Sequence, residues 1–465
     1  VKRIRARHHR KRLKELSALF AGQDVRAHDG PISTVRFSHD GKFLATAGDD
    51  KLVKVWRVME GERSNLVDIP ADADPSCTYF TMNRLSELKP LEKDDPQKII
   101  RRSLRKSMDS ACVIFPQKVF RILEEPVRIF RGHGGAILDL SWSQNNCLLS
   151  SSVDKTVRLW KLGVDHCIKI FSHTDYVTCI QFNPVNDDYF VSGSIDGKVR
   201  IWSINGCQVV SWTETKEIIT AVSYSPDGEV GVFGSFSGSC QFFSVGDNRL
   251  QFESEVCLTS KRKLPSTKRI TGFQVIKCVQ FLPDDPQKVL VSCADSQIRI
   301  IDRSNVVAKY KGLRNSGCCL SASFTRNGKH IVSASEDSNV CLWNYDARRG
   351  TTVRSLEFLP CEAPSIAVPW PGMDRSSFEI VPVVGPGFFS SSAAAAATWP
   401  EEKLPPIAEN VKRNSSRLGK SEYRLFKASC QNSSSGTHAC GLVFVTAGSD
   451  GRIRSFHNYG LPIPL

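Results

Sequence analysis

The 465-residue sequence predicts an all-β fold in which seven copies of one small sheet close into a ring. Three observations support this prediction. A similar segment recurs along the chain, so that Trp160 and Trp202 end neighbouring copies 42 residues apart. Each copy alternates apolar and polar residues, and its runs are separated by hairpin dipeptides such as Asp-Gly and Asn-Gly. A sheet of this size cannot bury both faces alone, so neighbouring copies must stack.

Four copies are the clearest, and each ends in a tryptophan that follows an aspartate by six residues. A second strand-like run precedes each of them, which predicts four strands for each copy. The four copies are LATAGDDKLVKVW at Trp56, LLSSSVDKTVRLW at Trp160, FVSGSIDGKVRIW at Trp202 and IVSASEDSNVCLW at Trp343.

Three weaker copies end at Phe243, Ile301 and Phe456, which brings the total to seven. The intervals between copies exceed one period at three places, so we expect insertions at about 60–126, 246–269 and 371–438. The third insertion is rich in Ala, Ser and Pro, a composition that does not fold alone. We therefore expect residues 16–465 to form the ring and residues 1–15 to form a basic tail ahead of it.

These repeats resemble the WD-repeat family, whose copies run from Gly-His to Trp-Asp and build a seven-bladed WD40 β-propeller; Gly132-His133 matches that start. In such a ring the N-terminal strand commonly completes the last blade. We expect 16–25 to pair with the blade that ends at Phe456, which hides an open sheet edge. A short apolar run, 365–368, is expected to be the innermost strand of that same blade.

A recurring set of His, Ser or Thr, Asp and Trp is the main candidate constellation. A single copy of this set resembles the catalytic triad of a hydrolase. A catalytic triad, however, is found at one place in a chain, whereas this set recurs with the repeat. We therefore predict buried hydrogen-bond networks that lock the blades, and no catalytic residue. The predicted network residues are His28, Thr46, Asp50 and Trp56; His133, Ser150, Asp154 and Trp160; His173, Ser192, Asp196 and Trp202; and Ser333, Asp337 and Trp343.

Composition and motif content exclude several classes of protein. The chain is 41% hydrophobic and 24% charged, and no run approaches the roughly 20 apolar residues of a membrane-spanning helix. The 16 cysteines have no metal-site spacing and read as buried thiols of a reducing compartment. Phosphate-loop, HExxH and GxSxG motifs are absent, so we expect no enzyme activity, no metal and no cofactor.

The formal net charge of +14 points to anionic partners, and the excess is local. One candidate contact patch lies in the second insertion, where it could meet an acidic protein or an anionic membrane; a solvated loop is the alternative. The patch consists of Lys261, Arg262, Lys263, Lys268 and Arg269.

The stretch from Arg131 to Trp160, RGHGGAILDLSWSQNNCLLSSSVDKTVRLW, resembles the Rab-binding WD-repeat proteins of endosomal traffic, and we expect a plant homologue. The resemblance implies a monomeric, non-enzymatic protein-interaction scaffold in the cytoplasm, peripheral on endosomal or Golgi membranes, with a Rab-family GTPase as partner. In that family Rab recognition lies largely upstream of the propeller, so no Rab-binding residue is assigned here.

A nuclear or RNA-associated WD-repeat scaffold is the alternative, because eight Lys or Arg residues stand between Val1 and Lys14. That segment lacks the interleaved aromatics of a single-strand-binding surface, which makes nucleic acid the less favoured partner.

Overall fold

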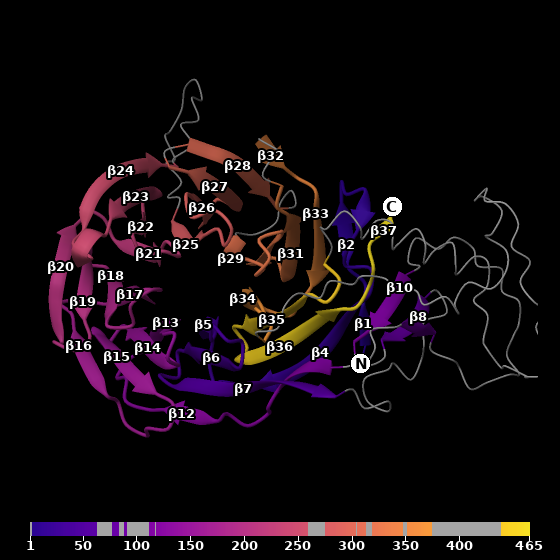
Figure 1. Ribbon diagram of the computed structural model, residues 1–465, viewed down its shortest axis with the longest axis horizontal. Coiled ribbons are helices and arrows are strands. Elements are labelled where there is room, and N and C mark those ends of the chain that lie inside the picture. Colours follow the sequence, from indigo (N-terminus) through magenta and orange to yellow (C-terminus); the bar gives the residue numbers. More distant parts are fainter. Residues whose placement is uncertain are drawn as a thin grey trace, which may run out of the picture.

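The computed structural model is a ring of seven blades arranged around a central axis (Figure 1). It describes residues 2–62, 77–82, 88–90, 111–116, 118–258, 275–303, 305–312, 319–346, 351–373 and 439–465. Apart from one 3-10 turn, η1 (Gly246–Asn248), every regular element in this part of the chain is a strand. In the same ranges no helix has the length and apolar character needed to cross a membrane.

Each blade is an antiparallel sheet whose first strand lies nearest the centre of the ring and whose fourth lies toward the circumference. Blade one contains β5 (Ile32–Phe37), β6 (Phe43–Gly48), β7 (Val53–Glu62) and β12 (Arg128–Phe130). Blade two contains β13 (Ile137–Trp142), β14 (Cys147–Ser152), β15 (Thr156–Lys161) and β16 (Lys169–Ser172). Blade three contains β17 (Val177–Phe182), β18 (Tyr189–Ser194), β19 (Lys198–Ser203) and β20 (Gln208–Glu214). Blade four contains β21 (Ile219–Tyr224), β22 (Val230–Ser235), β23 (Ser239–Ser244) and β24 (Gln251–Cys257).

The remaining three blades follow the same plan. Blade five contains β25 (Ile276–Phe281), β26 (Lys288–Cys293), β27 (Gln297–Asp302) and β28 (Asn305–Lys311). Blade six contains β29 (Cys319–Phe324), β30 (His330–Ser335), β31 (Asn339–Asn344) and β33 (Leu356–Pro360). Blade seven contains β34 (Pro364–Pro369), β35 (Val443–Gly448), β36 (Arg452–Asn458) and β4 (Leu19–Arg26).

The hydrophobic core lies between the blades. Val55 of blade one, for example, shares a buried cluster with Leu140, Trp142 and Trp160 of blade two. Because each blade buries its faces only against its neighbours, the ring must close to remove the last open pair of faces.

The first and last parts of the chain close the ring, as the sequence predicts. Strand β4 pairs antiparallel with β36, from Arg452 opposite Arg26 to Asn458 opposite Leu19, with one register shift between Arg454 and Phe456. Strand β34 is the innermost strand of blade seven, which confirms the expectation for 365–368. The third insertion therefore falls inside this blade, between β34 and β35, and its residues 374–438 lie outside the described residues.

The first two insertions differ from the expected boundaries. Within 60–126, strand β11 (Lys118–Ile122) continues the sheet of blade one by pairing with β7. Strands β8 (Cys77–Met82), β9 (Leu88–Pro90) and β10 (Ala111–Phe115) form a separate three-stranded sheet. The second insertion was placed at 246–269, but β24 is the outer strand of blade four, so the connection begins only after Leu258.

Residues 2–14 form short strands, which corrects the expectation of a basic tail. Strand β1 (Lys2–Ile4) adds a fifth strand to blade seven, and β2 (Arg7–His9) adds one to blade six. Strand β3 (Leu13–Lys14) pairs with β37 (Ile463–Pro464) near the C-terminus. Blade five also gains a fifth strand, β32 (Thr351–Val353), parallel to β28.

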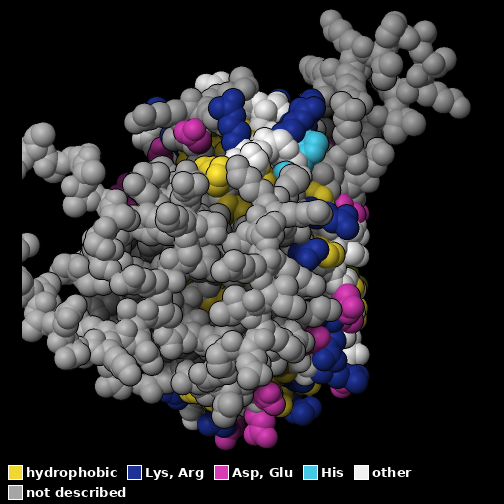
Figure 2. Space-filling view, turned by 90° about the vertical axis from the view of Figure 1, so that its right-hand side faces the viewer, with side chains coloured by type: hydrophobic (Ala, Val, Ile, Leu, Met, Phe, Trp, Pro, Cys, Tyr) yellow, Lys and Arg dark blue, Asp and Glu magenta, His cyan; other side chains and the backbone are white. Residues whose placement is uncertain are grey.

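The basic segment forms strands because the outer strand of a blade has unpaired backbone N–H and C=O groups. Pairing at such an edge uses only the backbone, so a segment with basic side chains can occupy it. Arg7, His8, Arg10 and Arg12 stay exposed. On the side of the ring that carries these edges, Figure 2 shows Lys, Arg and His side chains close together in its upper part.

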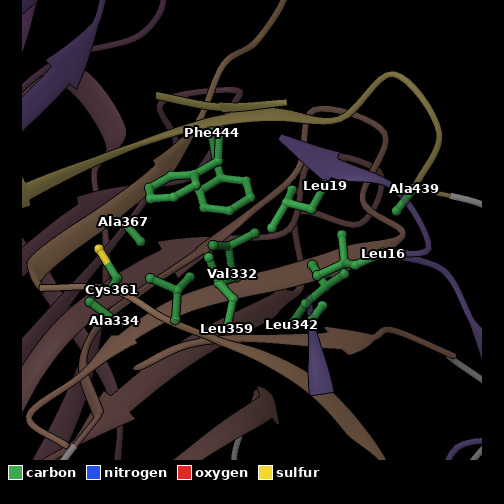
Figure 3. Close-up of a cluster of buried hydrophobic side chains, with 13 residues drawn as sticks. Leu16, Leu19, Val332, Ala334, Leu342, Leu359, Cys361, Ala367, Ala439 and Phe444 are labelled. Atoms are coloured by element: carbon green, nitrogen blue, oxygen red, sulfur yellow. The ribbon is translucent and has the colours of Figure 1, made fainter. Parts of the chain in front are cut away.

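Residues 11–16, which follow β2, are anchored to blade six by a buried polar cluster. The Glu357 carboxylate, on β33, accepts hydrogen bonds from the backbone N–H groups of Glu15 and Leu16, each at 2.7 Å. The Lys11 ammonium lies 3.2 Å from the same carboxylate. Beside this cluster, Leu16 and Leu19 pack against Val332, Leu342 and Leu359 (Figure 3).

Glu15 is the second carboxylate of this cluster. Its Oε2 lies 2.6 Å from Nε2 of His330, and its Oε1 accepts a hydrogen bond from Asn344 and lies 3.5 Å from Nζ of Lys11. Burial alone would raise the pKa of Glu15, but the His330 hydrogen bond and the Lys11 charge outweigh it and lower that pKa to about 2. Glu15 is therefore held ionised inside the protein.

Candidate functional site

The predicted networks of blades one and two are both formed. His28 bridges Asp50 and Thr46, with Nδ1 at 2.8 Å from Oδ2 and Nε2 at 2.7 Å from Oγ1, and Trp56 donates to the same Oγ1 at 2.9 Å. In blade two the corresponding residues are His133, Asp154, Ser150 and Trp160. There both His133 contacts are 2.7 Å, and Trp160 donates to Ser150 at 2.8 Å.

The electrostatics of these networks suit a structural role. Burial lowers the pKa of His28, although the Asp50 carboxylate opposes that shift, so the imidazole is neutral at physiological pH. Burial alone would raise the pKa of Asp154, but hydrogen bonds from His133 and Thr156 bring it below its usual range. The hydroxyls of Thr46 and Ser150 are fully buried and each accepts a hydrogen bond from its Trp, so neither is presented to a substrate.

Blade three forms only part of its predicted network. His173 Nε2 lies 2.9 Å from Ser192 Oγ, and Trp202 donates to that hydroxyl at 3.0 Å. Asp196, however, binds Arg200 at 2.6 Å and Thr174, while His173 Nδ1 faces a backbone carbonyl. Burial and the nearby Arg200 charge lower the pKa of His173 to about 4.

The predicted set in blade six does not form a network. Trp343 donates to the backbone carbonyl of Lys311 at 3.3 Å, and Ser333 donates to the carbonyl of Ala334 at 3.1 Å. Oδ1 of Asp337 is buried without a hydrogen-bond partner. The sequence offers no histidine at the bridging position of this blade, so nothing connects the aspartate to the hydroxyl.

Sequence reasoning missed a second recurring contact, an ion pair between an aspartate and the arginine four residues later. It joins Asp196 to Arg200 in blade three and Asp295 to Arg299 in blade five. In blade seven it joins Asp450 to Arg454. The spacing Asp-x-x-x-Arg is visible in the sequence, but it also occurs at Asp154 and Arg158 of blade two, where Asp154 binds His133 instead. The spacing alone would therefore not have identified these pairs. Two of these blades lack the histidine, and there the arginine takes its place as the aspartate's partner.

Replacing His133 by alanine should lower the free energy of unfolding by about 2–3 kcal/mol, because two buried hydrogen bonds are lost and Asp154 keeps fewer partners. Urea unfolding followed by tryptophan fluorescence measures the change. His166→Ala, at an exposed position, is the control and should change stability by less than about 0.5 kcal/mol. A His133→Ala variant as stable as this control would show that the network contributes nothing.

One face of the ring carries a repeated pair of residues around the centre, which we call the rim pairs. In each pair the residue just before the first strand accepts, through its carbonyl, a hydrogen bond from the N–H at the turn between the second and third strands. The rim pairs, with N–O distances of 2.9–3.1 Å, are Pro31 and Asp49, Ala136 and Val153, Tyr176 and Ile195, Ile218 and Phe236, Val275 and Ala294, and Ala363 and Ser449.

The rim pairs of blades three and four form an apolar sector. Tyr176 is 43% exposed, Ile218 39% and Phe236 40%, although all three are large hydrophobic side chains on short turns. Their backbones are fixed by the rim hydrogen bonds, so this sector is rigid. Exposed aromatic side chains on a rigid surface are typical of the centre of a protein–protein interface.

The predicted basic patch, Lys261 to Arg269, lies outside the described residues. Its flanking residues, Leu258 and Val275, lie on the same face as the rim pairs, next to the apolar sector. In the part of the chain that the structure describes, no group of three or more His, Cys, Asp or Glu side chains is arranged to hold a metal ion.

Comparison with known proteins agrees with this architecture. The family model described as WD domain, G-beta repeat matches residues 22–57, 124–161, 165–203 and 306–344. WD repeat-containing protein 44 of Xenopus laevis is 33% identical over 70% of this chain and 35% of its own length. An uncharacterized WD repeat-containing protein of Schizosaccharomyces pombe is 32% identical over 66% of this chain and 46% of its own length.

A guanine nucleotide-binding protein subunit beta of Zea mays is more distant, at 24% identity over 70% of this chain and 83% of its own length. The chain spans between a third and a half of the length of the first two relatives. The repeated sheets, the closed ring and these matches together make the chain a WD40-repeat β-propeller protein that is similar to WD repeat-containing protein 44.

Proposed function

We propose that this protein is a non-enzymatic scaffold that docks a GTP-bound Rab-family GTPase on its rim and acts in endosomal or vesicle traffic. The observation that carries the docking proposal is the apolar sector of Tyr176, Ile218 and Phe236, three exposed hydrophobic side chains held on one rigid face. The choice of partner rests on the resemblance of Arg131–Trp160 to Rab-binding WD-repeat proteins and on the similarity to WD repeat-containing protein 44. Because Rab recognition in that family lies largely upstream of the propeller, the contact at the rim is a proposal that rests on the apolar sector of this chain alone.

The physical argument for docking at this sector concerns what it offers a partner. A turn that presents an aromatic side chain with a fixed backbone loses little conformational entropy on binding. Among the described residues, the turns that surround the sector in blades one to three are short. Polar groups border the sector: Glu217 accepts hydrogen bonds from Ser237 and Ser239 in blade four. An apolar centre with a polar border matches the anatomy of a specific interface.

The proposal also covers location. A scaffold that binds a membrane-anchored GTPase works at the cytoplasmic surface of the membrane that carries the GTPase. We therefore place the protein in the cytoplasm, peripheral on endosomal or Golgi membranes. The basic residues Lys261 to Arg269, which lie outside the described residues, are the part of the sequence that we propose meets an anionic membrane.

The double variant Tyr176→Ala with Phe236→Ala should weaken Rab binding by about tenfold or more, because each truncated aromatic removes contact area at the interface centre. Surface plasmon resonance of the full chain over a panel of GTP-locked and GDP-locked Rab proteins measures this change. Phe252→Ala is a matched control, because this phenylalanine is 59% exposed but lies on the outer strand of blade four.

The control should bind as the unchanged protein does, and thermal melting should show both variants folded. Equal affinity for the GTP-locked and GDP-locked forms, or no binding to any Rab protein, would refute the choice of partner. Rab binding that survives the double variant unchanged would refute the docking surface and leave the partner standing.

A further inference from the structure

A pocket of about 410 Å³ lies at the seam between blades five and six, on the outer side of the ring. It is built from three separate parts of the chain: the end of β2, the turn before β27 with the end of β28, and the link between β32 and β33. Its lining residues are His9, Arg10, Asp295, Ser296, Gln297, Lys311, Gly312 and Arg354.

Strand register explains why these residues meet. Gln297 lies opposite Lys311 where β27 pairs with β28. Parallel pairing of β28 with β32 sets Tyr310 opposite Val353. Lys311 and Arg354, which follow these two residues in the chain, therefore lie next to each other. The antiparallel pairing of β2 with β33 sets His9 opposite Leu356, which brings the end of β2 to the same point.

The pocket holds an excess of positive charge that the described residues do not compensate. Within the described ranges, the side chains of His9, Arg10, Lys311 and Arg354 make no hydrogen bond or ion pair with other described residues. The one carboxylate in the lining, Asp295, is already paired with Arg299, with Nη1 at 3.0 Å from Oδ1. Like charges that converge in one pocket repel one another unless an anion binds between them.

We propose that this pocket binds a small anion with two or more phosphate groups, of the class of inositol polyphosphates, either free or as the headgroup of a lipid. Arginine guanidinium groups bind phosphate through paired hydrogen bonds, and lysine adds a point charge. The volume is within the range of small-ligand sites. The lining contains no Phe, Tyr or Trp on which a base could stack, which favours a phosphorylated polyol over single-stranded nucleic acid.

This site does not rest on the proposed Rab interaction, because none of its residues belongs to the apolar sector. It does depend on the N-terminal segment, which supplies His9 and Arg10. A ligand that binds only when β2 is docked must stabilise the docked state in proportion to its concentration and affinity. Ligand binding and protection of residues 2–14 should therefore rise together.

The test uses the full chain and inositol 1,4,5-trisphosphate in calorimetric titrations at about 0.15 M salt, an ionic strength that screens exposed charges. The variant Lys311→Gln with Arg354→Gln should bind at least about tenfold more weakly, because two charged hydrogen-bond donors are lost. Arg10→Asn is a second variant, which keeps a residue type that tolerates the positive φ of 54° at this position. Lys216→Gln with Arg249→Gln, at exposed positions elsewhere, is the matched control and should bind within about twofold of the unchanged protein.

A second arm distinguishes the two sources of the headgroup. Phosphatidylcholine vesicles with and without phosphatidylinositol 4,5-bisphosphate are sedimented with the protein. Vesicle binding that needs the phosphorylated lipid and is lost in both pocket variants identifies a lipid headgroup, whereas binding of the free trisphosphate alone identifies a soluble ligand. The proposal is overturned if the pocket variants bind trisphosphate as the control does, if inorganic sulfate binds equally well, or if RNA is the only anion whose binding the variants reduce.

Discussion

Replacing Glu357 by alanine is expected to lower the free energy of unfolding by about 3–5 kcal/mol, the range for removing one partner from a buried ion pair. The Glu357 side chain is fully buried, and Lys11 beside it is 6% exposed. Without the carboxylate, the Lys11 ammonium keeps its burial but loses a counter-charge at 3.2 Å. The backbone N–H groups of Glu15 and Leu16 lose their acceptor as well.

Urea unfolding followed by tryptophan fluorescence measures this loss, and limited proteolysis shows whether residues 2–14 leave the ring first. Glu362→Ala is the matched control, because this carboxylate is 89% exposed and, among the described residues, pairs only with Arg454, at 3.5 Å. Its removal should change stability by less than about 1 kcal/mol. If Glu357→Ala is too unstable to purify, Glu357→Gln should show a smaller loss in the same direction. A Glu357→Ala variant as stable as Glu362→Ala would mean that the N-terminal segment is not held by this cluster.

The ring itself could be predicted because its cause is periodic. Each blade repeats one pattern of apolar alternation and hairpin turns, and the pattern can be counted along the sequence. Closure by β4 followed from the same count, since the seventh copy has no outer strand of its own and an earlier segment must supply it. Copies that lacked the terminal Trp, such as the one ending at Phe243, still formed blades because burial requires only a large apolar side chain there.

The N-terminal strands could not be predicted in this way. Strand β1 pairs three residues and β2 pairs three, too few to leave a detectable alternation. Edge pairing depends on the backbone, so the side chains carry no signal of it. The polar cluster is equally hidden, because Glu15 and Glu357 are far apart in sequence and a lone glutamate in a strand pattern reads as solvent-exposed.

The hydrogen-bond networks show a different limit of prediction from sequence. Residue types at the repeat positions identify which side chains come close, and in blades one and two that was sufficient. In blade three the same four residue types are present, but Asp196 binds Arg200 and not His173. In blade two an arginine, Arg158, stands at the same position, yet Asp154 binds His133. A guanidinium–carboxylate pair is a charged, two-point contact, and a neutral imidazole offers a weaker one. Which of the two partners is bound differs between the blades, and the motif alone does not report it.

Replacing Phe20 by alanine is expected to lower the free energy of unfolding by about 3–5 kcal/mol, the range for a large-to-small change of a buried aromatic. Phe20 lies on the closing strand β4 and is fully buried. Its ring is 5.8 Å from that of Phe115 on β10 and 5.8 Å from that of Tyr459 near the C-terminus. One side chain therefore joins the closing strand, the sheet of the first insertion and the end of the chain.

Cysteine labelling can show where the Phe20→Ala variant loosens. Cys112 lies on β10 and Cys179 on blade three, and both are buried, whereas Cys207 is exposed. In the unchanged protein, N-ethylmaleimide should label Cys207 alone of these three. In Phe20→Ala, Cys112 should become reactive while Cys179 stays protected, because the cavity separates β10 from the ring and leaves blade three intact. Phe236→Ala, which truncates a 40% exposed ring, should leave both buried thiols protected. Equal reactivity of Cys112 and Cys179 in Phe20→Ala would instead mean that the ring opens as a whole, so that the inserted sheet and the blades unfold as one cooperative unit.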